Sequence, residues 1–190
     1  MKKFFDAILT SVIKTISDST DSELFSDQIE ESTFNQYKIE LPSLDKKNSK
    51  IDIAQEIIGF HNAPEGVNFT PGHPMEYALF TIPVLGSVNI FKLITGPLYS
   101  DRKVGFDGEY LYYKEFSTQR ITGNDPVIQN IRENARLKIG LFESRLDGFK
   151  VEVDSFHVNS LKPTIKQTIE NERKKRERKS DSIKKMNPFS

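Results

Sequence analysis

The sequence predicts an α+β fold: a small antiparallel β-meander packed against a C-terminal antiparallel helical hairpin and an N-terminal amphipathic helix. Three observations predict it. β-Branched and aromatic residues concentrate between positions 77 and 116, apolar residues recur at helical spacing after Pro126, and the first seventeen residues carry one apolar stripe. We expect an N-terminal helix with an acidic linker over 1–36, a core domain over 37–169 and a basic helix extension or tail over 170–190.

The composition limits the class of protein. The chain has 190 residues, with 27 Lys and Arg against 27 Asp and Glu, which excludes the strongly basic body of a typical nucleic-acid binder. It has no Cys, so disulfides, thiolate metal sites and a Cys nucleophile are excluded. No apolar stretch is long enough to span a bilayer. We therefore expect an intracellular, cytoplasmic protein without a membrane span.

The N-terminal segment predicts an amphipathic helix over residues 2–17. Its stripe either packs on the chain's own core or docks a partner; the polar face has too few Lys and Arg for strong membrane attraction. Residues 18–36 are acidic and predict a solvated linker or a short helix. We take as candidate partner-binding residues four members of the stripe: Phe5, Leu9, Val12 and Ile16.

The middle of the chain predicts strands and turns. Alternation predicts a strand over 37–41, and Ser49 with Asp52 resembles the start of a short helix through Ile58. Prolines and glycines predict a long loop over 62–74. We then expect antiparallel strands with a tight hairpin at Asp107-Gly108; their ranges are 77–84, 88–95, 103–106 and 109–116.

After the sheet the apolar period becomes helical. Asp125-Pro126 predicts a helix start and Gly148 its end. A second helix follows from Val153 to Ile169, with Pro163 kinking or restarting it. Alternation over 149–154 also fits a strand. A short connection between two long helices favours an antiparallel hairpin.

Catalytic motifs are absent from the sequence. It contains no phosphate-binding glycine loop, no nucleophile elbow and no zinc-protease motif. In the 61–76 loop, His61, Glu65, His73 and Glu76 have no spacing typical of metal ligands. We expect no catalytic residue, no metal and no cofactor. A hydrolase with an unrecognised site in this loop stays an alternative.

The C-terminal segment is the most site-like feature. Glu170–Lys185 holds eight bases against four acids, whereas Met1–Asn35 holds three bases against seven acids. These ends can meet each other, a partner or a polyanion. A solvated helix end is one interpretation, and nucleic-acid binding another. The candidate phosphate-contacting residues are Arg173, Lys174, Lys175, Arg176, Arg178 and Lys179.

Three segments carry a family resemblance: IPVLGSVNIFKLIT, DPVIQNIRENARLKI and FHVNSLKPTIKQTIENERKKR. Together they resemble the N-terminal module of bacterial multidomain proteins associated with anti-phage defence, where a variable effector domain follows. Here the chain ends at Ser190, and we expect no effector domain. The resemblance implies a sensor, scaffold or accessory subunit and supplies no active-site residues.

The leading hypothesis is a non-catalytic interaction subunit of a bacterial protein assembly, of the anti-phage defence kind, with another protein as its partner. The alternatives are a nucleic-acid-binding accessory protein and the hydrolase. The sequence leaves the oligomeric state open.

Overall fold

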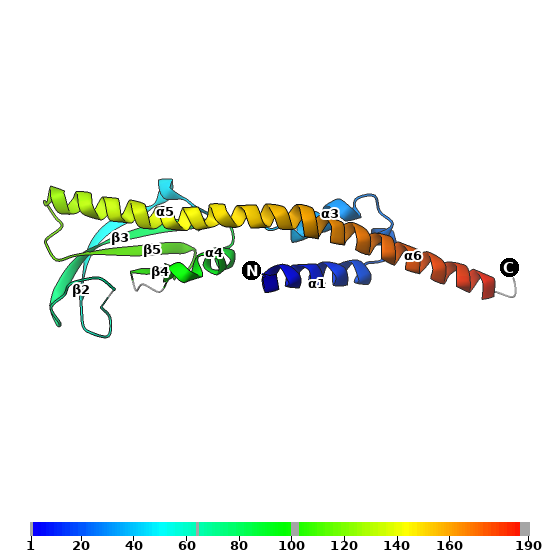
Figure 1. Ribbon diagram of the computed structural model, residues 1–190, viewed down its shortest axis with the longest axis horizontal. Coiled ribbons are helices and arrows are strands. Elements are labelled where there is room, and N and C mark those ends of the chain that lie inside the picture. The colour runs from blue at the N-terminus through cyan, green and yellow to red at the C-terminus, as the bar shows by residue number, and fades with distance from the viewer. Residues whose placement is uncertain (1, 64, 100–102, 187–190) are drawn as a thin grey trace. The chain divides into compact units, whose positions relative to one another are not determined.

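The computed structural model describes residues 2–63, 65–99 and 103–186 and has the expected α+β fold (Figure 1). The chain forms two compact units. The first combines Met1–Ile39 with Val151–Ser190, and the second is Glu40–Lys150. Among the described residues, no helix is both long enough and apolar enough to cross a membrane.

The second unit contains an antiparallel sheet. Its order is β1-β3-β5-β4, and β2 also pairs with β3. One face of the sheet packs against helix α5, Asp125–Phe156, and Phe91, Phe142 and Leu111 are fully buried there. The strands are β1 Ser43–Leu44, β2 Lys50–Ile57, β3 Pro74–Leu85, β4 Val104–Asp107 and β5 Tyr110–Ser117.

The prediction of a strand over 88–95 is wrong, because this segment is helix α4, Val88–Thr95. The Ser87 hydroxyl accepts a hydrogen bond from the Ile90 N–H and so caps the helix. Phe91 and Ile94 are buried, and their three-residue spacing suits a helix better than a strand. With α4 between β3 and β4, strand β5 pairs with β3, so the sheet is not a simple meander.

The prediction of a helix from Ser49 to Ile58 is also wrong. This segment is β2, which pairs along its whole length with β3, Ile53 lying opposite Ala78. Pairing with a long neighbouring strand outweighs a local capping pattern. Residues 58–63 and 65–73 form no helix or strand, as expected for the loop, and β4 and β5 form the expected hairpin with Gly108 at φ 56°.

The C-terminal helical region begins at Asp125, as predicted, but does not end at Gly148. Helix α5, Asp125–Phe156, is followed by a π-helical segment, His157–Leu161, and then by α6, Lys162–Met186. Helical structure is therefore continuous over the described residues 125–186. The strand alternative over 149–154 is excluded, and the turn that an antiparallel hairpin requires is absent.

The apolar spacing explains why the helix continues. Phe149, Val153 and Phe156 are buried at steps of four and three residues, which carries the stripe past Gly148. The next buried residue, Leu161, comes five residues later, and the π-helical turn absorbs this longer step. Pro163 lies two residues after Leu161; a proline cannot donate a helical hydrogen bond, and it favours local departures from α-helical geometry.

The first unit consists of helices packed on α6. Helix α1 is Lys2–Asp18, close to the predicted range, and it contacts α6 and α3 (Figure 1). The segment expected to be a linker holds two helices, α2 Asp21–Leu24 and α3 Ile29–Tyr37. The strand predicted over 37–41 is absent, because Tyr37 ends α3 and its hydroxyl hydrogen-bonds with that of Thr15 on α1.

Candidate interaction surface

The predicted partner-binding stripe on α1 divides into two parts. Val12 and Ile16 are fully buried in the chain's own core. Phe5 and Leu9 are half-buried and line a hollow of about 620 Å³ together with Phe156. The rings of Phe5 and Phe156 stack, with centroids 4.5 Å apart. The structure therefore brings Phe5 and Leu9 to a surface and uses Val12 and Ile16 for internal packing.

Arg173, a candidate phosphate contact, binds the chain's own N-terminal segment. Its Nε donates to the Leu24 carbonyl at 2.8 Å, and an Nη donates to the Ser26 carbonyl at 3.1 Å. The guanidinium also lies 5.7 Å from the centre of the Phe25 ring. These carbonyls belong to the last residue of helix α2 and to the turn after it. Arg173 on α6 therefore caps the C-terminal end of α2 from another helix of the same chain.

Arg176 makes a second set of internal contacts. It donates to the Asp21 carboxylate at 2.6 Å, to the Ser17 carbonyl at 3.1 Å and to Glu172 at 3.2 Å. Burial raises the pKa of Glu172, but hydrogen bonds from Lys175 and Arg176 outweigh it, so this pKa is lowered. The hydrogen bond to Asp21 raises the pKa of Arg176.

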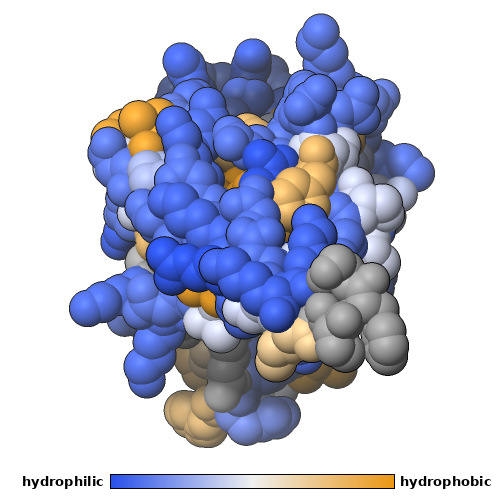
Figure 2. All heavy atoms as spheres, turned by 90° about the vertical axis from the view of Figure 1, so that its right-hand side faces the viewer, coloured by the Kyte–Doolittle hydropathy of each residue, from blue (hydrophilic) through white to orange (hydrophobic). Residues whose placement is uncertain are grey.

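The remaining bases of the run face solvent. The side chains of Lys174, Arg178 and Lys179 are exposed and have no hydrogen bond or ion pair with another described residue. Figure 2, which looks from the side where α6 ends, shows a mainly hydrophilic face. The oppositely charged ends of the chain thus meet each other through Arg173 and Arg176, and only part of the basic run stays available for a polyanion.

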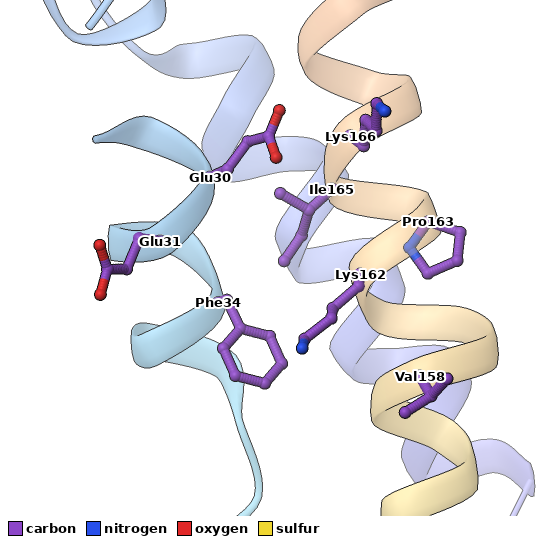
Figure 3. A pocket seen from close by; sticks show the side chains of 8 residues that line it. All are labelled: Glu30, Glu31, Phe34, Val158, Lys162, Pro163, Ile165 and Lys166. Carbon is purple, nitrogen blue, oxygen red and sulfur yellow. The ribbon is translucent and has the colours of Figure 1, made fainter. Parts of the chain in front are cut away.

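A groove separates α3 from α6 (Figure 3). It encloses about 630 Å³; Phe34 and Lys162 point toward each other, with the Lys162 Nζ 4.9 Å from the ring centre. His157 stands edge-on to Phe34, and its Nε2 accepts a hydrogen bond from the Ile39 N–H at 2.9 Å. Burial lowers the pKa of His157. This histidine therefore fixes the chain just after α3, and the sequence alone had no signal for that contact.

The second unit contains a buried carboxylate, Glu115, on β5. Its oxygens accept hydrogen bonds from the Asn134 amide on α5, at 3.0 Å, and from the Tyr113 hydroxyl. The Lys103 Nζ lies 3.9 Å away. A polar hollow of about 400 Å³ adjoins the Glu115 carboxylate. The hydrogen bonds from Asn134 and Tyr113 satisfy this carboxylate within the chain.

The structure does not assemble the histidines into a metal site. His61, Glu65 and His73 are exposed loop residues, and the Glu76 carboxylate accepts from the Ile121 N–H at 2.7 Å. In the part of the chain that the structure describes, no group of three His, Cys, Asp or Glu side chains could hold a metal ion.

The edge of the sheet at β2 exposes three isoleucines on one strand. Ile51, Ile53 and Ile57 are 65%, 44% and 64% exposed. They share a sheet face with the buried Ala78 and Phe80, their neighbours on β3. Among the described residues β2 pairs only with β3, so its outer side has no neighbouring strand.

The opposite face of β2 is charged. Glu56 binds the Lys114 Nζ at 2.6 Å, and Lys114 also lies over the Tyr77 ring. Burial lowers the pKa of Lys114, but the hydrogen bond and charge of Glu56 outweigh it, so this pKa is raised. The Asp52 carboxylate accepts from the Ile53 N–H at 2.8 Å and thereby occupies an edge donor.

This surface lies outside the sites expected from the sequence, although the sequence contains a signal for it. Isoleucines at positions 51, 53 and 57 are separated by even numbers of residues, which is typical of one face of a strand. The pattern that suggested a helix start at Ser49 concealed it.

The sequence matches no protein-family model, and neither the curated proteins nor the solved structures compared with it give a match.

Proposed function

We propose that this chain is a non-catalytic interaction subunit that binds another protein chain by adding a strand of that chain to the open edge of β2. The observation that carries the proposal is the exposure of Ile51, Ile53 and Ile57 on a strand with one neighbour. It keeps the functional class that the sequence favoured and moves the binding surface from α1 to β2.

The geometry of a sheet edge explains the recognition. An added strand forms main-chain hydrogen bonds, while side chains at alternate positions contact the isoleucines. Covering an isoleucine that is about half exposed contributes about 1 kcal/mol. Three such contacts, added to the main-chain pairing, favour an extended apolar segment of a folded partner over a small ligand.

The face beneath the isoleucines supports the same occupant. Ala78 and Phe80 continue the apolar layer inward from Ile53 and Ile51, so the exposed isoleucines extend the unit's own core to its edge. A strand that presents apolar side chains on this face would close that layer. Long apolar edges usually invite such pairing.

The test compares two variants of the full chain. Ile53→Lys places a charge in the exposed stripe, and Leu137→Lys makes the same type of change on α5, where Leu137 is also exposed. The tagged chains are used to capture partners from cells of the source organism after nuclease treatment, and circular dichroism checks that each variant is folded.

We expect a protein that is captured by the original chain and by Leu137→Lys and is lost with Ile53→Lys. Equal capture by both variants would contradict the proposal. Recovery that disappears on nuclease treatment would favour nucleic-acid binding through Lys174, Arg178 and Lys179 instead.

A further inference from the structure

We infer that the strand added to β2 is β2 of a second copy of this chain, paired antiparallel with Ile53 opposite Ile53 on a two-fold axis. This inference rests on the proposed function, because it names the occupant of the same edge. It predicts a symmetric homodimer in which two sheets join into one.

The charges of β2 select the register. Two identical antiparallel strands keep the same side chains on the same face only if the two-fold axis passes between two copies of one residue, so that this residue lies opposite itself. An axis at Ile53 puts Lys50 opposite the partner copy's Glu56, and by symmetry Glu56 opposite its Lys50. Both pairs are of opposite charge, which favours cross-strand pairing.

Neighbouring registers are less favourable. An axis at Ala54 places Asp52 opposite the partner copy's Glu56, and an axis at Asp52 places two Asp52 carboxylates together; both arrangements are repulsive. With the axis at Ile51, only residues 50–52 of the two strands lie opposite each other, so the paired segment is short. An axis at Gln55 leaves the charged residues without opposite charges.

The apolar face agrees with the register at Ile53. The two Ile53 side chains meet on the axis, and each Ile51 lies opposite the aliphatic part of Gln55. Because Ile53 lies beside Ala78 and Ile51 beside Phe80 in each copy, the dimer would join the two apolar layers. On the other face, the Glu56 carboxylate has two oxygens and can accept from both Lys114 and the second copy's Lys50.

Asp52 opposes this pairing in the single chain. Its carboxylate occupies the Ile53 N–H, the donor nearest the axis, and must turn away when the second strand arrives. Charged side chains on edge strands commonly limit association in this way. Removing this carboxylate, as in Asp52→Ala, should therefore tighten the dimer.

The experiment measures the mass of the full chain by sedimentation over a series of concentrations. Four chains carry changes on β2: Lys50→Glu, Glu56→Lys, the double exchange and Asp52→Ala. A control exchange, Lys174→Glu with Glu177→Lys, makes the same charge changes at exposed positions of α6. Circular dichroism confirms folding of every variant.

We expect a concentration-dependent dimer that each single charge change weakens about tenfold, since two attractive pairs become repulsive at once. The double exchange should restore it and Asp52→Ala should strengthen it, while the control exchange leaves it unchanged. A monomer at every concentration, or a double exchange that fails to restore the dimer, would overturn the inference.

The two proposals can fail separately. If the chain is monomeric but Ile53→Lys still abolishes capture of another protein, the proposed function stands and the homodimer is refuted. If a dimer forms that neither Ile53→Lys nor the charge changes affect, the homodimer through β2 is refuted. If Ile53→Lys and Leu137→Lys also capture the same proteins, the proposed function is refuted as well.

Discussion

Arg173 provides the sharpest test of how the charged ends are used. Arg173→Ala removes a charged donor from two carbonyls, those of Leu24 and Ser26. Each hydrogen bond contributes about 1 kcal/mol once the partial exposure of the guanidinium is allowed for. The contact with Phe25 adds about 0.5 kcal/mol. We therefore expect a loss of about 2.5 kcal/mol in the free energy of unfolding.

The assay is urea unfolding followed by circular dichroism, with Lys174→Ala as the matched control. Lys174 is the next residue and carries the same charge, but its side chain is exposed and has no hydrogen bond or ion pair with another described residue. Its replacement should therefore change the free energy of unfolding by less than about 0.5 kcal/mol. Arg173→Lys keeps the charge but loses the planar fork, and about half of the loss should remain. If Arg173→Ala and Lys174→Ala prove equally stable, the internal cap contributes nothing and the reasoning is refuted.

Two further predictions concern the helices. Gly148→Ala should stabilise the chain by about 1 kcal/mol in urea unfolding, because Gly148 lies inside α5 with open space around its Cα; destabilisation would indicate that it ends the helix in a left-handed conformation. His157 has a pKa lowered by burial, so as the pH falls through about 6.5 the unfolded chain takes up its proton first. Its contribution to stability is complete above that pH and is lost below it, and His157→Gln should flatten the profile of urea midpoint against pH. An unchanged profile would contradict this account.

Elements with strong local signals could be predicted from the sequence. Helix α1 has a continuous stripe, α5 starts at an Asp-Pro pair, and the hairpin at Gly108 needs a residue that tolerates positive φ. The errors fall where two patterns compete. Val88–Thr95 is rich in β-branched residues, yet the Ser87 cap and the burial of Phe91 and Ile94 make it a helix.

The candidate sites illustrate the same limit. The basic run was visible in the sequence, but the sequence could not show that Arg173 and Arg176 bind carbonyls about 150 residues away along the chain. Nor could it show that Val12 and Ile16 are buried while Phe5 and Leu9 reach a hollow. Each outcome depends on which segment packs alongside.

The sequence by itself determined the α+β class, the amphipathic N-terminal helix, the separation of charge and the absence of catalytic motifs, because these follow from composition and short-range periodicity. The tertiary structure alone decided the pairing of β2 with β3 and thereby the exposure of Ile51, Ile53 and Ile57. A strand's two sides become different only when one of them finds a neighbour. That neighbour lies more than twenty residues away along the chain at Ile53, beyond the range of any local pattern.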